Sequence, residues 1–400
     1  MSIPLRSLFL HHLAQTSPAP MGIEVESSEG VYIHGKGGDR WIDLISGISV
    51  CNVGHRHPRV VEAIKAQVDR YMHVMVYGEY IQSPQIHLAE RLASLVPGLD
   101  SVYLVNSGAE AIEGAIKLAR RATGRKKLFS FRDAYHGSTT GALSLMSSDY
   151  FTEPFKPLLP EVFHFESYSE SVLEKIDTDT AAVFIEIIRA EVGAIPVEHT
   201  ILHAIQKRCR ETGALLVVDE IQTGFGRTGP FLASSAAGIE PDILVLAKGM
   251  GGGLPIGAFI SSGKLMQTLS NEPVLGHITT FGGNPVCCAA ALAVFDVVKE
   301  LDTDKMVPEK EAFIRKKLNH PALRSIDGKG LLLALDFGEE ALAQRIIKTC
   351  IRNGVLTDWF LFAPHKLRMA PPLTITLEEL DSACTIILKS IDEALEKEPD

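Results

Sequence analysis

The stretch Leu215–Gly229, LLVVDEIQTGFGRTG, begins with a run of four aliphatic residues, and the acid Asp219 follows this run directly. A second stretch, Leu244–Gly253, reads LVLAKGMGGG, and the lysine Lys248 follows its apolar run in the same way. Continuous apolar runs of this kind are typical of strands that are buried on both faces of a sheet. The interval between Asp219 and Lys248 is long enough for a crossover between neighbouring parallel strands. These two stretches therefore indicate a sheet with an acid and an amine at its edge.

Other apolar runs of the same kind alternate with helical patterns between about residues 99 and 260. Alternation of strands with helices favours an α/β fold, with a mostly parallel sheet and right-handed crossovers. The candidate strands are SVYLVN, KLFSF, AAVFIEI, ALLVVDE, DILVLAK and IGAFIS.

The two ends of the chain read differently from this middle part. Residues 31–46, VYIHGKGGDRWIDLIS, predict two strands around a glycine-rich turn, and a helix is expected from Pro58 to Tyr71. After Pro285 come a long helical stretch, a strand GLLLALDF, a charged helix and HKLRMAPPLTIT. We expect residues 1–55 to be an N-terminal segment that joins a small domain. Residues 56–285 would then form a large cofactor-binding domain, and residues 286–400 the C-terminal small α+β domain.

Composition restricts the class of protein. The chain has 400 residues, of which 46% are hydrophobic, and a formal net charge of −10, so a large core is possible and nucleic acid or an anionic membrane is not expected as a partner. No signal peptide or apolar run of membrane-spanning length is expected. The six cysteines contain no C-x-x-C pair, which favours a reducing, cytoplasmic setting.

Asp219 and Lys248 gain meaning from their place at strand ends. Ligands of open α/β sheets bind outside the carboxyl ends of the strands, so both side chains can reach one crevice. A lysine there is either a surface residue or a reactive amine. The glycines after Lys248 would let the backbone bend close to a ligand.

A third motif, VYLVNSGAEAIEGAIKLARRA, runs from a strand into Ser107, Gly108 and Ala109 and then into an amphipathic helix. The free N–H groups at such a helix start form an anion site, and Gly108 would let a phosphate approach. Ser107 with Glu110 three residues later also fits an ordinary capping box, so both interpretations stay open.

The turn DAYHGST adds Tyr135 and His136 after the strand KLFSF. An aromatic ring at a strand end can stack on a flat ligand, although a turn tyrosine is often only a packing residue. Together the motifs describe a phosphorylated ring with a basic nitrogen and an aldehyde, which is pyridoxal 5′-phosphate (PLP). Lys248 would form the Schiff base, and Asp219 would keep the ring nitrogen protonated.

The motifs LLVVDEIQTGFGRTG, LAKGMGGGLPIGAF and TTFGGNP, in this order, resemble those of class-III PLP-dependent aminotransferases. That group includes ornithine, acetylornithine, 4-aminobutyrate and ω-amino acid aminotransferases. The resemblance extends from LISGISVCNVGHRHP to LRMAPPL, nearly the whole chain. It implies the fold-type-I architecture: a large domain with a mostly parallel seven-stranded sheet, a smaller α+β domain, and a homodimer with shared active sites.

The resemblance also implies roles for single residues. Lys248 and Asp219 match the catalytic lysine and the partner of the ring nitrogen, and Ile221 matches the residue on the ring face opposite Tyr135. Gln222 matches a glutamine near the ring hydroxyl. The remaining cofactor contacts implied are Ser107, Gly108 and Ala109 at the phosphate, His136 in the YHG turn, and Thr280, which would reach the phosphate of the neighbouring subunit.

The substrate side departs from the family pattern. Arg368 matches the arginine that grips a substrate carboxylate, and Glu191 the glutamate that pairs with it and releases it. Ser138 stands where many glutamate-using members have arginine, which puts 2-oxoglutarate in doubt as acceptor. Arg189 replaces a glutamine and could compensate if it points into the cavity. Tyr77 is a further candidate at the entrance.

An amino acid or ω-amine is expected as donor and a 2-oxo acid as acceptor, with the amino group moved in two half-reactions. Alternatives are an aminomutase or a decarboxylase of the same fold, or a catalytically silent binding protein, which the intact Lys248 and Asp219 disfavour. His55 and His57 resemble a metal pair, but no third ligand is apparent, so no metal is expected.

Overall fold

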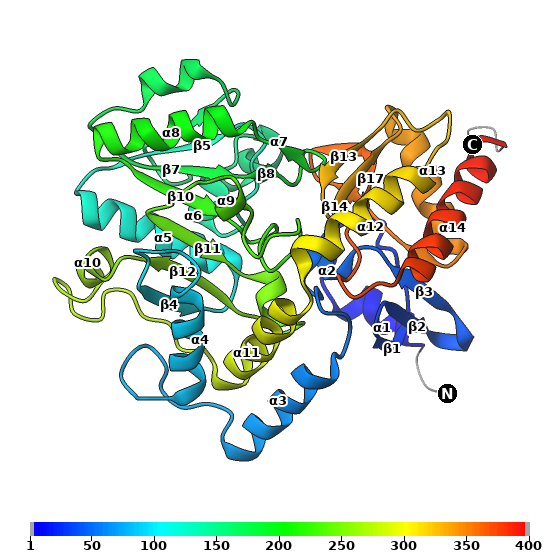
Figure 1. The fold of residues 1–400 in the computed structure, drawn as a ribbon, viewed down its shortest axis with the longest axis horizontal. Helices are drawn as coiled ribbons and strands as arrows, with labels where there is room; N and C mark the ends of the chain where they lie inside the picture. Colours follow the sequence, from blue (N-terminus) through cyan, green and yellow to red (C-terminus); the bar gives the residue numbers. More distant parts are fainter. Residues whose placement is uncertain (1–3, 397–400) are drawn as a thin grey trace.

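The computed structural model describes residues 4–396, which divide into a larger and a smaller region on the two sides of Figure 1. The larger region holds a seven-stranded sheet, and the smaller one holds two four-stranded sheets. The chain passes from the first to the second through α11 (Pro285–Glu300) and α12 (Thr303–Lys317). The domain boundaries at residues 55 and 285 stay predictions.

The large sheet has the strand order β4-β12-β11-β10-β7-β5-β6. Strand β12 is antiparallel to both its neighbours, and the other pairs are parallel, which confirms the predicted mostly parallel α/β sheet. Each predicted strand is present, whereas β6 was not predicted because this edge strand is short and only partly buried. The bounds are β4 (Ser101–Val105), β5 (Lys127–Phe131), β6 (Val162–Phe165), β7 (Thr180–Glu186), β10 (Leu215–Asp219), β11 (Ile243–Leu246) and β12 (Gly257–Ser261).

Helices cover both faces of this sheet. Along β10, Leu216 and Val218 pack in the same core cluster as α8 (His199–Thr212), while Val217 packs in the cluster that includes α5 (Gly108–Thr123). Because successive strand residues point to opposite faces, burial on both faces requires an unbroken apolar run. Three further helices pack beside β4, β11 and β12: α3 (Pro58–Arg70), α4 (Ser83–Ala93) and α11.

The smaller region combines both ends of the chain. Strand β3 pairs in parallel with β15 through Ile42 and Val355, so early and late segments share one sheet. In Figure 1 the blue strands β2 and β3 lie in the same region as the red C-terminal helix α14. The sheets consist of β1 (Val25–Glu29), β2 (Tyr32–Gly35), β3 (Arg40–Asp43) and β15 (Val355–Leu356), and of β13 (Ser325–Lys329), β14 (Leu332–Asp336), β17 (Ala363–Met369) and β16 (Trp359–Phe360). Their core partners are α12, α13 (Glu340–Arg352) and α14 (Leu377–Glu396).

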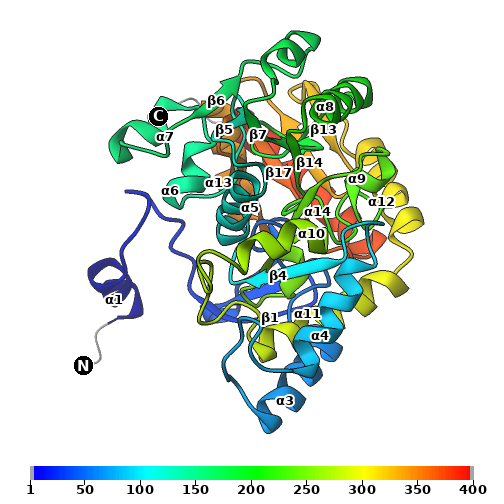
Figure 2. The ribbon, with the colours of Figure 1, turned by 90° about the vertical axis from the view of Figure 1, so that its left-hand side faces the viewer.

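The remaining helices, turns and short strands lie outside the three larger sheets. The N-terminal helix α1 (Leu5–His12) buries none of its residues and stands away from the rest of the chain in Figure 2. Among the helices of residues 4–396, none is both long and apolar enough to cross a membrane. The remaining elements are α2 (Ser46–Ser49), α6 (Thr140–Ser144), α7 (Asp149–Thr152), α9 (Ala233–Ala236), α10 (Gly263–Met266), the hairpin β8 (Ile188–Arg189) and β9 (Ile195–Pro196), and the 3₁₀ turns η1 (Lys36–Gly38), η2 (Glu153–Phe155), η3 (Glu170–Lys175), η4 (Lys248–Gly251) and η5 (Gln267–Leu269).

Candidate active site

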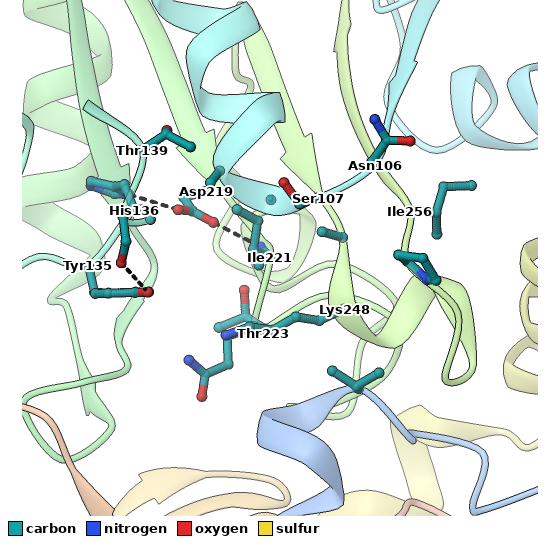
Figure 3. A pocket seen from close by; sticks show the side chains of 18 of the residues that line it. Asn106, Ser107, Tyr135, His136, Thr139, Asp219, Ile221, Thr223, Lys248 and Ile256 are labelled. Atoms are coloured by element: carbon teal, nitrogen blue, oxygen red, sulfur yellow. Dashed lines mark hydrogen bonds and ion pairs between the residues drawn. The ribbon is translucent and has the colours of Figure 1, made fainter. Parts of the chain in front are cut away.

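A cavity of about 730 Å³ lies at the carboxyl ends of the parallel strands. Asp219 at the end of β10 and Lys248 just after β11 both line it, and Figure 3 shows them beside Ser107 and Tyr135. The strand ends meet because β10 lies between β7 and β11 in the sheet. The structure therefore brings the acid and the amine, which are separated in the sequence, to one cavity.

Asp219 is a buried carboxylate with a histidine behind it. The His136 Nδ1–H donates to Asp219 Oδ2 at 2.7 Å, and the Ile221 backbone N–H donates to Oδ1 at 2.9 Å (Figure 3). Burial opposes protonation of His136, but the hydrogen bond to Asp219 and its charge outweigh burial and raise the histidine pKa. The pair thus holds a negative group at the cavity with its orientation set by a buried ring.

Lys248 begins η4 with a φ of +45°, a left-handed conformation that favours glycine and costs energy in a lysine. Burial lowers the pKa of its amine, and the charge of Arg368 acts in the same direction, while Glu191 opposes them. A neutral amine is therefore more accessible at Lys248 than at an exposed lysine. The left-handed turn and the lowered pKa together distinguish Lys248 from a surface lysine.

The start of α5 closes another side of the cavity. Ser107 caps this helix, since its Oγ accepts from the Glu110 backbone N–H at 3.2 Å, while the Glu110 carboxylate accepts from the Asn106 backbone N–H at 2.8 Å. The Ser107 half of the predicted capping box is therefore present, whereas the Glu110 carboxylate bonds one residue earlier than such a box requires. Ser107, Gly108 and Ala109 still line the cavity. A Cβ on Gly108 would lie 2.7 Å from Ile221 Cδ1, so glycine also makes room for that side chain.

Tyr135 and Ile221 line the cavity as well, together with Gln222 and Ser138. The Tyr135 hydroxyl lies 3.2 Å from Ser138 Oγ.

Glu186, which sequence reasoning missed, ends β7 beside Asp219 in register and also lines the cavity. Burial raises its pKa to about 7. The signal was available, because AAVFIE ends in an acid just as LLVVD does.

Arg368 lies in β17 and is buried, and each of its five N–H donors has a partner. Nη1 donates to Glu191 Oε1 at 3.1 Å and to Gln222 Oε1 at 3.2 Å. Nη2 donates to Glu191 Oε2 and to the Trp359 backbone carbonyl, both at 3.0 Å. The Nε–H donates to Asp358 Oδ1 at 2.8 Å. The guanidinium is therefore held by two carboxylates at once.

Glu191 responds strongly to this arginine. Burial opposes its ionisation, but Arg368 outweighs burial and lowers the Glu191 pKa to about 2. The Leu361 backbone N–H also donates to Glu191 Oε2, at 3.1 Å.

Asp358 was missed by sequence reasoning. Pairing WF (359–360) with the strand around Arg368 as a hairpin would have indicated it, because β16 and β17 place the two residues together.

Three predicted site residues are not brought to the cavities that contain Lys248. Arg189 Nη2 donates to the Arg132 backbone carbonyl at 2.9 Å, because strand alternation in β8 sends Arg189 away from the face of Ile188, which lines the cavity. Tyr77 lines a separate pocket with Ile278, and Thr280 is exposed on the loop before α11. Within this chain, Arg189 therefore does not take the cavity position needed for the suggested compensation.

Comparison with known proteins gives one consistent result. The family Aminotransferase class-III matches residues 13–391. The chain is 38% identical over 378 residues to an acetylornithine aminotransferase from Archaeoglobus fulgidus, covering 94% of this chain and 97% of that protein. It is 40% identical over 384 residues to an acetylornithine aminotransferase from Mycobacterium leprae, covering 93% and 92%.

Solved structures agree with this assignment. The ornithine aminotransferase from Toxoplasma gondii matches with a TM-score of 0.90 and 30% identity, covering 98% of this chain and 94% of that one. A PLP-bound amine transaminase from an uncultivated Pseudomonas species matches with a TM-score of 0.87 and 26% identity, covering 96% and 98%.

The cavity fits PLP on its own geometry. Its volume is in the range of small-ligand sites, and the first N–H groups of α5 suit a phosphate. Asp219 is a buried acid whose one ion-pair partner among residues 4–396 is His136, so it can accept a cationic ring nitrogen. From the family match over most of its length, the chain belongs to the class-III aminotransferases, PLP-dependent enzymes that move an amino group from a donor to a 2-oxo acid.

Proposed function

We propose that this enzyme takes an amino group from an amino acid or ω-amine in one half-reaction and gives it to a 2-oxo acid in the next. The observation that carries the proposal is the meeting of Lys248 and Asp219, from neighbouring strands, in a cavity that the start of α5 also lines. An amine, a buried carboxylate and an anion-binding helix start are what a PLP enzyme requires of its protein.

Each group at this cavity receives one task. Lys248 would hold the cofactor at its aldehyde carbon, and Ser107, Gly108 and Ala109 would hold the phosphate. The remaining cofactor contacts are assigned to Tyr135, His136, Asp219, Ile221 and Gln222. When bound, PLP supplies an electron-withdrawing ring for the electron pair released as the C–H bond beside the transferred nitrogen breaks. Asp219 would favour a protonated ring nitrogen, and His136 would orient Asp219.

Lys248 would also move the proton. Its amine, with a pKa lowered mainly by burial, can take the proton from the donor carbon at Nζ and return it to a neighbouring atom. A neutral amine is needed for this step, and the desolvated position of Lys248 supplies it. We therefore expect the amine half-reaction to become faster as the pH rises through a Lys248 pKa that lies below the ordinary lysine value.

Arg368 and Glu191 would manage the carboxylate of the 2-oxo acid. Glu191 uses one donor on each terminal nitrogen of Arg368, at 3.1 and 3.0 Å, which is the pattern of a bidentate carboxylate. A substrate carboxylate can take the same two donors only when Glu191 leaves. Asp358, Gln222 and the Trp359 carbonyl would hold the remaining donors in place.

We also infer a homodimer with shared sites. Support comes from the loop before α11, where large apolar side chains are exposed: Val274, Leu275, Ile278 and Phe281. Such clusters commonly mark an interface. Thr280 lies in this loop, and the likeness to the family assigns it to the cofactor site of the neighbouring subunit. Tyr77 lines one pocket with Ile278 of the same loop. The free cysteines of the described chain favour a cytoplasmic setting.

The test uses the purified enzyme loaded with PLP and mixed with donor amines without an acceptor. The absorbance of the bound cofactor should change once per site, and a carbonyl product should appear in equal amount. Adding pyruvate should then restore the absorbance and yield alanine. Relatives 36–40% identical are named acetylornithine aminotransferases, so N-acetylornithine belongs in the panel. Release of CO₂, or an amine moved within one molecule, would instead indicate the decarboxylase or the aminomutase.

A further inference from the structure

Arg227, in the motif GFGRTG that follows β10, is completely buried, with an exposed fraction of 0%. Its Nη1 group donates to the Leu331 carbonyl at 2.9 Å and to the Pro371 carbonyl at 2.5 Å, and Nη2 donates to Asn52 Oδ1 at 2.6 Å. Each of these three acceptors is uncharged, whereas a buried cation ordinarily pairs with an acid. The hydrogen bonds therefore hold Arg227 to three separate segments of the chain.

Two of the three acceptors belong to the strand pair that carries Arg368. Leu331 directly precedes β14, and Pro371 lies just beyond the end of β17. The two strands are antiparallel, with Ala334 opposite Arg368, so the start of β14 lies beside the end of β17. The Leu331 backbone N–H also donates to the Arg227 carbonyl, at 3.0 Å. A loop of the large region thus binds both strands at the same end of the pair.

The third acceptor, Asn52, connects Arg227 with the turn that holds Lys248. Asn52 Nδ2 donates to the Phe225 carbonyl at 3.0 Å. A Cβ on Gly249 would lie 2.5 Å from the same nitrogen, so the Asn52 amide packs directly against the backbone that follows Lys248. One side chain therefore contacts both Arg227 and the backbone beside the reactive amine.

The contact between Glu191 and Arg368 joins the same two regions. Strand β17 is thus held to the large region at Arg368 and again beyond its end, where Arg227 binds Pro371. A substrate carboxylate that displaces Glu191 opens the first of these ties, and the second remains. Arg227 lines neither of the two adjoining cavities that contain Lys248, the one of about 730 Å³ and a second of about 670 Å³ that also contains Glu191 and Arg368.

We propose that Arg227 is a positioning residue: it holds β17, and with it Arg368, in place relative to Lys248 while a substrate carboxylate displaces Glu191. The inference rests on the role proposed for Arg368 and adds a residue that acts through it. Arginine suits this task because its planar group offers donors in several directions, whereas a lysine has a single nitrogen. Burial is already complete within one chain, so a second subunit cannot reach the guanidinium.

The test is a cycle of four proteins: the wild type, Arg227→Lys, Arg368→Lys and the double variant. We expect Arg227→Lys to lower kcat/KM for pyruvate about tenfold, since lysine cannot bind all three segments. In the Arg368→Lys background the same change should lower it less than about twofold, because the guanidinium that Arg227 positions is gone. Each rate is divided by the bound PLP, so that inactive protein does not contribute. A general loss of stability would give the same factor in both backgrounds.

Arg125→Lys is the matched control. Arg125 also binds two backbone carbonyls, those of Thr180 and Thr212, but both lie in the large region. Its kcat/KM for pyruvate should stay within about twofold of the wild-type value. If Arg227→Lys does not fold, Asn52→Ala takes its place in the cycle. It removes the Nη2 acceptor but leaves both carbonyls, so the expected factor is about threefold.

Hydrogen–deuterium exchange gives a readout without turnover. In Arg227→Lys the amides of residues 331–336 and 363–370 should exchange faster than in the wild type, and in Arg125→Lys they should not. Equal factors in both backgrounds of the cycle, or unchanged exchange in these strands, would overturn the inference. A normal kcat/KM for pyruvate in Arg368→Lys would instead overturn the role proposed for Arg368, on which the inference rests.

Discussion

The two ends of the active-site space differ in how their charges are balanced. At the cofactor end, defined by Ser107, Asp219 and Lys248, a buried acid and a helix start face open space. At the carboxylate end, defined by Glu191, Asp358 and Arg368, one guanidinium already has two acids and no free donor. Asp219 has His136 as its one ion-pair partner among residues 4–396, and a ligand at the cofactor end can add its charges without breaking that pair, whereas the carboxylate end must break an internal pair before a ligand can bind.

This difference predicts how large the effect of a substitution should be at each end. Removing a group at the cofactor end takes away an interaction for which the protein has no substitute. Removing a group at the carboxylate end also removes the internal pair that a ligand would have to break. The net effect is therefore the difference between the lost contact with the ligand and the lost internal pair. Substitutions should therefore have their largest effects near Lys248 and their smallest effects outside both ends.

The largest effect is expected for Lys248→Ala. Loss of the amine removes both the attachment of the cofactor and the proton carrier, so turnover should fall about 10⁴-fold or more. Steady-state rates measure this, and the absorbance of the purified protein should change with it. Lys264→Ala, at an exposed lysine, is the matched control and should keep wild-type rates. Turnover within tenfold of wild type in Lys248→Ala would remove Lys248 from the reaction.

Asp219→Asn should come next. The amide keeps the shape but loses the charge that favours a protonated ring nitrogen, so kcat should fall about 10²-fold or more, about 3 kcal/mol. PLP content, measured after release in alkali, should stay close to stoichiometric because the phosphate contacts remain. Asp39→Asn, at an exposed acid, serves as control. A normal kcat with full PLP content would exclude the assigned role.

Arg368→Lys tests the carboxylate end alone. Lysine cannot offer two parallel donors to a carboxylate, so kcat/KM for pyruvate should fall by about 2 kcal/mol or more. The half-reaction with a donor amine that carries no carboxylate has no group for Arg368 to bind, so it should change little and acts as an internal control. Equal losses in both half-reactions would show that the two ends are not separable.

Glu191→Gln should show how much the internal pair with Arg368 contributes to the free energy of unfolding. The folded pKa of Glu191 is about 2, below its ordinary value of 4.5, so its contribution is present above pH 4.5 and is lost as pH falls toward 2. At neutral pH the wild type should exceed the variant by about 3 kcal/mol in free energy of unfolding. Urea unfolding at pH 7, 5, 4 and 3 measures the difference, which should begin to shrink near pH 4.5. A difference that stays constant to pH 3 would argue against this ion pair.

The smallest effect is expected for Arg189→Gln. Its guanidinium donates to the Arg132 backbone carbonyl and lines neither cavity, so kcat/KM for pyruvate and for 2-oxoglutarate should each stay within about twofold, the size of a 0.5 kcal/mol surface effect. Both enzymes should favour pyruvate, because Ser138 offers no cation to the second carboxylate of 2-oxoglutarate. A selective fall with 2-oxoglutarate would place Arg189 near substrate and extend the carboxylate end.

Local sequence patterns were sufficient to predict the large sheet and the cofactor end. Leu215–Asp219 and the run before Lys248 are unbroken apolar segments because helices cover both faces, and parallel strands end at one edge of a sheet. The position of Asp219 beside Lys248 thus follows from topology, which local patterns reveal. The edge strand Val162–Phe165 escaped prediction because one-sided burial left no such run.

The arrangement of the carboxylate end, in contrast, depends on how distant parts of the chain pack together. Glu191 belongs to the β8–β9 turn of the large region, and Arg368 and Asp358 belong to a hairpin of the small region, so their contact depends on how the two regions dock. The direction of Arg189 depends on the pairing of the short strand β8 with β9, which turns Arg189 away from the face of Ile188. Strand ends are placed by hydrogen bonding and periodicity within a sheet. Contacts between segments so far apart in the sequence depend on the packing of whole regions, which no local pattern encodes.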